Sequence, residues 1–198
     1  MHAYNKSYLP DVMDTLGLLF EYGTRSLGYD ITQWHSMLIS SGLACYIETG
    51  HPRFIAGMSA REMSIMLCGK SPAQDYEVRY GAQYWTGWAL AALQWHTGLS
   101  FAYIQMHGLS VERILQMYNP YHEADISKFL ADAEALVTDL GDLPDLKALR
   151  KASGLTQEEL SSRSGVPLRT IRSYEQGTRS LASADFRTVR LLSRALGI

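Results

Sequence analysis

The sequence predicts an all-α protein, with a multi-helix N-terminal domain followed by a smaller helical C-terminal domain. Apolar residues recur at spacings of three and four along nearly the whole chain, which is the period of amphipathic helices. Alternating β-branched runs bounded by turn dipeptides, which are typical of strands, do not occur in the sequence. A short Gly/Pro-containing segment, Gly141–Pro144, interrupts the helical pattern. We therefore expect helices throughout, with a domain boundary near residue 141.

Length and charge both support two domains, residues 1–141 and 142–198. At 198 residues the chain exceeds the roughly 100 to 150 residues of a common single domain. The first part carries 8 basic and 14 acidic side chains, a net charge of −6, and the second carries 10 and 6, a net charge of +4. A basic domain attracts phosphate, whereas an acidic domain is repelled by it. The two parts are thus expected to face different partners.

Composition excludes several classes of protein. The 46% hydrophobic and 19% charged residues are ordinary for a globular fold. No run approaches the roughly 18 apolar residues that span a bilayer, and the N-terminus lacks the apolar core of a signal peptide. We therefore expect a cytoplasmic protein without membrane contact. The two cysteines, Cys45 and Cys68, are too few for a disulfide scaffold or a thiolate zinc site.

The first third of the chain contains several helix start and stop signals. Pro10 suits the first turn of a helix, and Asp30 is a capping residue before the next one. Ser59 and Glu62 form a capping-box pattern, in which each side chain satisfies a backbone N–H of the other residue. Between these signals, the segment 50–58 is expected to be a loop. The expected helices cover residues 10–28, 31–41, 43–49 and 59–68.

The second half of the N-terminal domain centres on a helix over residues 83–96, which is rich in tryptophan and alanine and is expected to be buried. The polar segment 70–81 before it contains Pro72 and is expected to be a loop. Ser100 and Ser110 are placed to cap two short helices, and the Asn119-Pro120 pair then breaks the pattern. A last amphipathic helix over 124–140 presents one apolar stripe, formed by Ile126, Phe129, Leu130, Ala133 and Leu136.

Residues 156–165 have the features of a helix that ends in a tight turn. Thr156 and Glu159 form a second capping-box pattern, and Leu160 points into the core. Ser161 is small, where two helices approach closely. Gly165 falls at the turn, where a positive φ is needed and a Cβ would cost about 1 kcal/mol.

A second helix is expected directly after this turn, from about Pro167 to Gln176. Helical spacing places Val166, Ile171 and Tyr174 on its buried side. The residues left on its outward face are Leu168, Arg169, Arg172 and Ser173.

This run of residues is similar to the Cro/C1-type helix-turn-helix family of phage repressors and bacterial regulators, over the last quarter of the chain. The resemblance implies a five-helix domain whose second motif helix enters the major groove of double-stranded operator DNA. There an arginine hydrogen-bonds to guanine O6 and N7, and a leucine contacts a thymine methyl group. The base-reading residues so assigned are Leu168, Arg169, Arg172 and Ser173.

The resemblance also implies roles outside base reading. It pairs Arg150 with Glu175 as a structural ion pair. Two departures from the family pattern are Pro167, which replaces the usual hydroxyl cap, and an arginine in place of the glutamine that often reads adenine. The alternative is that this domain binds only protein, which salt-dependent binding to DNA would exclude. The implied phosphate contacts, which position the protein without specifying sequence, are Gln157, Gln176, Thr178 and Arg179.

The N-terminal domain carries little catalytic chemistry. Its six histidines lack the i, i+4 pairing and the neighbouring carboxylates of a metal site. The sequence contains no glycine-rich phosphate loop and no serine in a nucleophile elbow. We therefore expect that the protein is not an enzyme and that it uses no metal and no cofactor.

Aromatic residues are concentrated around the central helix, and at spacings of three, four and seven they line about one face of it. A buried core is the simpler interpretation. A partner-binding groove is the alternative, because tryptophan and tyrosine dominate binding hot spots. The apolar pair in segment 50–58 would join that surface. The candidate partner-binding residues are Phe54, Ile55, Tyr84, Trp85 and Trp88.

Three phrases of the N-terminal part, FIAGMS, YWTGWALAALQW and MYNPYHEADISKF, resemble those of bacterial regulators encoded beside ADP-ribosyltransferase-like toxins. The resemblance implies an antitoxin that neutralises such a toxin and represses its own operon. A homodimer is expected, because two recognition helices about 34 Å apart read successive major grooves. The alternative is a stand-alone repressor whose N-terminal domain senses a ligand or forms the oligomer. An apolar pocket near Trp85 and Trp88 would favour that alternative.

Overall fold

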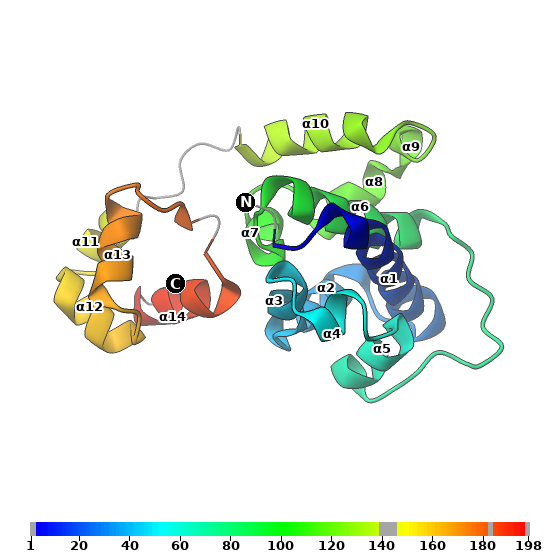
Figure 1. Ribbon diagram of the computed structural model, residues 1–198, viewed down its shortest axis with the longest axis horizontal. Helices are drawn as coiled ribbons and strands as arrows, with labels where there is room; N and C mark the ends of the chain where they lie inside the picture. The colour runs from blue at the N-terminus through cyan, green and yellow to red at the C-terminus, as the bar shows by residue number, and fades with distance from the viewer. Residues whose placement is uncertain (1–2, 139–145, 182–183, 197–198) are drawn as a thin grey trace. The chain divides into compact units, whose positions relative to one another are not determined.

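The structure, a computed structural model, describes residues 3–138, 146–181 and 184–196. It divides into two compact units, Met1–Asp139 and Leu140–Ile198, each with its own hydrophobic core. Every regular element among the described residues is helical, which confirms the all-α prediction (Figure 1). The predicted boundary at residue 141 lies outside the described residues. None of the described helices is long and apolar enough to cross a membrane.

The first helices of the N-terminal unit begin at the predicted signals. The helix α1 (Leu9–Glu21) carries Pro10 in its first turn and continues through a π-helical turn, Tyr22–Ser26. The carboxylate of Asp30 caps α2 (Ile31–Ser40) by accepting hydrogen bonds from the N–H groups of the second and third residues of this helix. Ser59 and Glu62 form the predicted capping box. The remaining elements of this part are η1 (Lys6–Tyr8), α3 (Leu43–Glu48), α4 (Pro52–Ile55) and α5 (Ala60–Cys68).

The prediction of a loop over residues 50–58 was wrong for its middle part, Pro52–Ile55. Residues Pro52–Ile55 form α4, a single helical turn capped by His51, whose ring nitrogen accepts a hydrogen bond from the backbone N–H of Arg53. Phe54 and Ile55 are only 6% and 7% exposed and belong to the core. Burying such side chains stabilises the fold by about 1.5–3 kcal/mol each. A single turn is too short to produce a helical period in the sequence, which is why the pattern did not reveal it.

The central helix of the unit is α6 (Ala82–Thr97), and α1 forms its most extensive helix pair (Figure 1). Gly87 permits this close approach, because a Cβ at this position would lie 2.4 Å from the backbone oxygen of Leu16. The buried residues of α6 surround most of its circumference, in agreement with its predicted central place.

The last helices of the unit also follow their predicted caps. The hydroxyl groups of Ser100 and Ser110 accept hydrogen bonds from backbone N–H groups at 3.1 and 3.3 Å. The Asn119–Pro120 bond is cis and lies in α9. The final helix begins at Ile126 and not at residue 124, because the Asp125 carboxylate accepts a hydrogen bond from Ser127 N–H at its start. The elements are α7 (Phe101–Met106), α8 (Val111–Gln116), α9 (Tyr118–Tyr121) and α10 (Ile126–Thr138).

Glu21 and His35 are among the buried polar residues described in this unit. The Glu21 carboxylate accepts hydrogen bonds from the Tyr76 hydroxyl at 2.8 Å and the Arg79 backbone N–H at 3.3 Å, so it ties the 70–81 segment to α1. The His35 ring is 1% exposed and packs between Phe20 and Phe101. Burial disfavours the imidazolium and lowers the pKa of His35 to about 4, although a hydrogen bond with Gln105 opposes the shift.

Four α-helices form the described part of the C-terminal unit: α11 (Leu146–Ala152), α12 (Gln157–Ser164), α13 (Leu168–Glu175) and α14 (Phe186–Leu196). The predicted number of five helices stays a prediction, because residues 182 and 183, between α13 and α14, lie outside the described residues. A small core holds the four helices together, and its buried members are Leu146, Leu155, Leu160, Val166, Ile171, Leu192 and Leu196.

Candidate nucleic-acid interface

Reciprocal hydrogen bonds fix the start of α12. The Thr156 hydroxyl accepts from Glu159 N–H at 3.1 Å, and the Glu159 carboxylate accepts from Thr156 N–H at 2.7 Å. These bonds lower the pKa of the Glu159 carboxyl, since they favour its charged form. The predicted capping box is therefore present, and it satisfies the backbone N–H groups of Thr156 and Glu159.

The turn between α12 and α13 is closed by a glycine and two serine hydroxyls. Gly165 has φ of 71°, the left-handed conformation that its position requires. The Ser161 hydroxyl donates to the Val166 carbonyl at 2.8 Å, and Ser164 accepts from Val166 N–H at 3.2 Å. Ser161 was predicted for its small size alone. Its hydroxyl also ties α12 to the residue before α13, so the angle between the two helices is set by hydrogen bonds as well as packing.

The helix α13 begins without a side-chain cap. Pro167 occupies the capping position in an extended conformation, and only its backbone oxygen accepts from the first turn, at 2.8 Å from Thr170 N–H. On the inner face of α13, Ile171 is fully buried and Tyr174 is half-buried. The helix is therefore held by its apolar face, which leaves its other side available to a partner.

Arg150 and Glu175 connect α11 to the end of α13 through a bidentate ion pair. The Arg150 Nε and Nη2 atoms lie 2.6 and 3.0 Å from the two oxygens of Glu175. A third nitrogen of Arg150 donates to the Leu155 carbonyl at 2.7 Å. Burial on its own would raise the pKa of the Glu175 carboxyl, but the hydrogen bonds from Arg150 and Gln157 and the charge of Arg150 lower it. This carboxylate thus stays ionised inside the domain.

Gln157 also belongs to this network. Its side-chain N–H group donates to Glu175 at 2.7 Å, while its oxygen accepts from Arg172 Nε at 3.3 Å. The amide expected to contact phosphate is therefore engaged within the protein.

Arg172 is exposed but is bonded to its own domain. Its Nη2 atom lies 3.0 Å from a carboxylate oxygen of Glu158, in an ion pair whose side chains are 50% and 64% exposed. Exposed pairs of this kind contribute only about 0–1 kcal/mol, so a partner can displace one at small cost. The guanidinium lies on the outward side of α13, as the helical spacing predicted.

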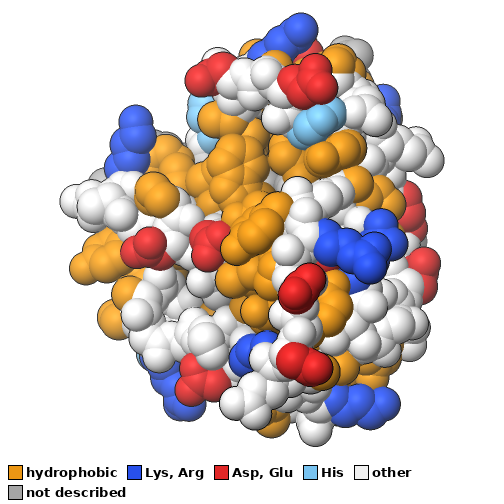
Figure 2. Space-filling view, turned by 90° about the vertical axis from the view of Figure 1, so that its right-hand side faces the viewer, with side chains coloured by type: hydrophobic (Ala, Val, Ile, Leu, Met, Phe, Trp, Pro, Cys, Tyr) orange, Lys and Arg blue, Asp and Glu red, His pale blue; other side chains and the backbone are white. Residues whose placement is uncertain are grey.

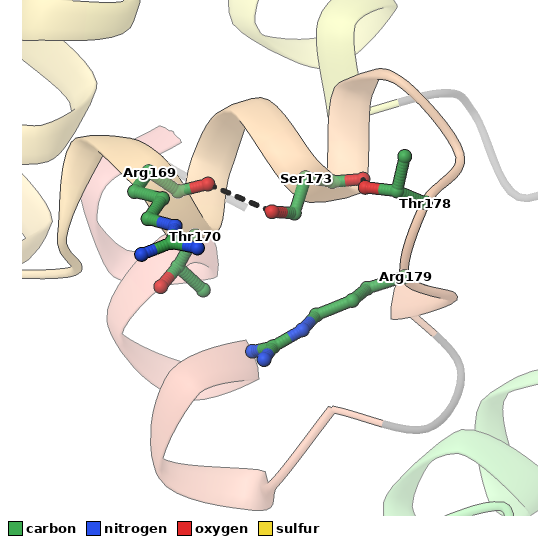
Figure 3. A pocket seen from close by; sticks show the side chains of 5 residues that line it. All are labelled: Arg169, Thr170, Ser173, Thr178 and Arg179. Atoms are coloured by element: carbon green, nitrogen blue, oxygen red, sulfur yellow. Dashed lines mark hydrogen bonds between the residues drawn. The ribbon is translucent and has the colours of Figure 1, made fainter.

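Two other predicted residues of α13, Arg169 and Ser173, border a hollow of about 430 Å³ between this helix and the segment after it (Figure 3). Arg169 and Arg179 contribute its two positive charges, and no lining residue is acidic. The Ser173 hydroxyl donates to the Arg169 carbonyl at 2.9 Å, and Thr178 donates to the Ser173 carbonyl at 3.0 Å. The two guanidinium groups suit this hollow to an anion such as a phosphate, whereas the Ser173 and Thr178 hydroxyls already donate within the domain.

Leu168 and Gln176 lie at opposite ends of α13. Leu168 is the first residue of the helix and is half-buried, whereas Gln176 is the exposed C-cap residue. The structure therefore brings the eight predicted DNA-contacting residues onto α13, the start of α12 and the segment after α13.

The candidate partner-binding residues of the N-terminal unit separate into two groups. Phe54 and Ile55 lie in the core, as described above, and do not line the same hollow as the others. Trp85 is 7% exposed and packs against Phe129, while Tyr84 and Trp88 are half-buried. A hollow of about 260 Å³, here called the aromatic hollow, is lined by Tyr80, Tyr84, Trp85, Trp88, Tyr118, Tyr121, His122, Ala124 and Ile126.

Sequence reasoning missed the second wall of the aromatic hollow, formed by the segment 118–126. These residues are more than twenty positions from Trp88, and only the packing of α9 beside α6 brings them to it. The aromatic residues around Asn119-Pro120 were the only signal in the sequence. Within the described part of the chain, no group of three or more His, Cys, Asp or Glu side chains is placed to hold a metal ion.

A capped helix, a left-handed glycine turn and a second helix with a basic outer face define a helix-turn-helix, the class of domain that binds DNA in the major groove. In agreement, a family model described as Helix-turn-helix matches residues 146–198. The protein is accordingly a DNA-binding transcriptional regulator, and the matched region is about a quarter of its chain. No curated protein and no solved structure shows significant similarity to it.

Proposed function

We propose that the protein is a sequence-specific repressor that binds an operator as a homodimer, with α13 in the major groove. The observation that carries this function is the outer face of α13, where Arg169 and Arg172 are exposed on a domain of net charge +4. Leu168 and Ser173 complete the base-reading face. Arg179, Thr178, Gln176 and the start of α12 at Gln157 contact the phosphates on either side. The function includes no catalytic activity.

The test is a titration of the full chain with the DNA upstream of its own reading frame and with a shuffled fragment of equal length. Specific binding is expected to be about 10³-fold or more tighter than binding to the shuffled fragment. Affinity should fall steeply between about 50 and 200 mM salt, because bound phosphates release counterions. Equal affinity for both fragments would contradict sequence specificity, and salt-independent binding would contradict a phosphate interface. Light scattering at the same concentrations tests the homodimer.

We further propose an antitoxin role, in which the N-terminal unit neutralises an ADP-ribosyltransferase-like toxin. The resemblance of three N-terminal phrases to regulators beside such toxins supports this role. So does the charge division of −6 and +4, because an acidic unit is poorly suited to DNA and is free for another partner. Co-expression with the product of the neighbouring gene should yield a stable complex. Failure of the two purified proteins to associate would contradict the antitoxin role and leave the repressor function intact.

A second candidate function is a repressor regulated by a small ligand. The aromatic hollow favours it, because an apolar pocket beside Trp85 and Trp88 is the feature that a ligand sensor requires. If this function is correct, a ligand of the hollow should change the affinity of the full chain for its operator. An affinity that stays the same at saturating ligand would exclude it.

A further inference from the structure

The aromatic hollow lies where the start of α6, α9 and the 70–81 segment meet. Figure 2 views this side of the N-terminal unit and shows a continuous band of hydrophobic side chains, bordered in its upper part by histidine and acidic side chains. Tyr80, at the rim, is 61% exposed and has φ of 49°, in the left-handed region that a tyrosine rarely adopts. A large ring is thus held at the solvent edge of the hollow by an unfavourable backbone conformation.

The rings of the hollow stand at steep angles to one another. Tyr80 and Tyr84 are 4.9 Å apart at 73°, and Trp85 and Tyr118 are 5.8 Å apart at 76°. Rings at such angles form the walls of a cage around a compact group, whereas a nucleobase requires two parallel faces with a gap between them. The one parallel stack, Tyr118 on His122 at 4.0 Å, has no room for a third ring. The geometry therefore favours a rounded group over a planar one.

Charge around the hollow favours a cation. The hydroxyls of Tyr84 and Tyr121 each donate to a carboxylate, Asp14 and Asp132, at 2.6 Å. Burial and the bond to Asp14 raise the pKa of Tyr84, and the bond to Asp132 raises that of Tyr121, so both phenols stay protonated. None of the described lining residues is lysine or arginine. The negative faces of the rings and the two carboxylates bonded to Tyr84 and Tyr121 therefore both favour a positively charged ligand.

Size restricts the ligand further. The hollow measures about 260 Å³, below the roughly 300–1,000 Å³ of pockets that enclose drug-sized molecules. A head group of a few heavy atoms fits such a space, and a trimethylammonium group is rounded, cationic and weakly hydrated. Aromatic cages recognise quaternary ammonium groups through the attraction between the cation and the ring faces.

We propose that the aromatic hollow is a binding site for a small organic cation with an alkylated ammonium head group. This assignment deepens the second candidate function, the ligand-regulated repressor, and supplies the chemical class of its ligand. It does not depend on the identity of the operator or on a toxin partner.

The test titrates the full chain with choline and, separately, with 3,3-dimethylbutan-1-ol, the neutral compound of the same shape, by calorimetry. Choline is expected to bind at least about tenfold more tightly, because only it carries the charge. A third arm, N-acetyl-trimethyllysine, distinguishes a modified protein side chain from a free metabolite as the source of the group. Equal affinity for choline and its neutral analogue, absence of binding by any cation, or tighter binding of adenosine would each overturn the assignment.

Variants locate the binding site. Trp88→Leu removes one wall and should weaken choline binding by about 5- to 30-fold, the range set by one cation–π contact. Tyr121→Phe keeps the ring and removes only the bond to Asp132, so it should fold normally and weaken binding about two- to fivefold.

The control is Tyr46→Leu, which removes a 46% exposed aromatic ring outside the hollow and should bind choline like the parent. Unchanged affinity in both hollow variants would overturn the assignment. Operator affinity measured on the same samples reports the DNA-binding function independently.

Discussion

Arg150 of α11 donates hydrogen bonds to both carboxylate oxygens of Glu175, the last residue of α13. The two side chains are only 11% and 2% exposed. Their ion pair fixes the end of α13 to α11. The same carboxylate accepts a bond from Gln157, so one buried charge links α11, α12 and α13.

Removal of this carboxylate should unfold the DNA-binding unit. We predict that Glu175→Ala lowers the free energy of unfolding by about 3–5 kcal/mol, because Arg150 would be left as an uncompensated buried charge. The loss should appear in calorimetric melting of the full chain, with DNA binding lost at the same temperature. Glu158→Ala, which breaks an exposed ion pair, is the matched control and should cost no more than about 1 kcal/mol. An unchanged melting temperature for Glu175→Ala would contradict the structural role of the pair.

Base reading is tested by the two exposed arginines of α13. Arg169→Ala and Arg172→Ala should leave the melting temperature within about 1 °C of the parent, since neither side chain is part of the core. Each should weaken operator binding by about 1–3 kcal/mol and reduce discrimination between operator and random DNA. Fluorescence anisotropy with both DNA fragments measures this difference. A loss of equal size on both fragments would identify the residue as a phosphate contact.

Glu158 competes with DNA for Arg172, and its removal should strengthen binding. We predict that Glu158→Gln tightens operator affinity about two- to fivefold, because the guanidinium loses its intramolecular partner and the domain loses a negative charge. Glu123→Gln removes the same charge from a 78% exposed side chain of the N-terminal unit and serves as the control. Weaker binding by Glu158→Gln would mean that the pair orients Arg172 for DNA.

Packing of α1 on α6 depends on the absence of a side chain at Gly87. Gly87→Ala would place a Cβ 2.4 Å from the Leu16 backbone oxygen, so the helices would have to separate. We predict a loss of about 1–3 kcal/mol in the stability of the N-terminal unit, measured by urea denaturation. Gly81→Ala, where a Cβ meets no atom within 4 Å, should change stability by less than about 1 kcal/mol. Equal stability of the two variants would show that the helix pair adapts to the methyl group.

Burial of neutral His35 should make the N-terminal unit sensitive to acid. The folded-state pKa is about 4, below the ordinary value of 6.5, so the unfolded chain binds the proton more tightly. The contribution to stability is therefore complete above about pH 6.5 and is lost as the pH falls towards 4. Between pH 7 and pH 5 the parent should lose about 2 kcal/mol more than His35→Leu, by urea denaturation at each pH. Parallel stability curves for the two proteins would show that His35 is not the group responsible.

Much of the fold follows from local signals in the sequence. Capping residues such as Asp30, Ser59 and Thr156 satisfy donors within three residues of themselves, so their function is readable from a short stretch of chain. Helical spacing likewise identified Ile171 as the buried anchor of α13. The single turn α4 had no such period, and for that reason Phe54 and Ile55 were expected in a loop.

The sequence by itself determined the all-α class, the capped helix α12 with its glycine turn, and the residues on the outer face of α13, because each depends on contacts between near neighbours. Only the tertiary structure decided which side chains those residues bind. Arg172 is exposed as its spacing requires, yet its position beside Glu158 depends on how α13 crosses α12. The aromatic hollow likewise needs α9 beside α6, a meeting of segments that no local pattern encodes. Such sites form when segments that are distant in the sequence pack together, and the burial of apolar surface that drives this packing is not encoded in any one segment.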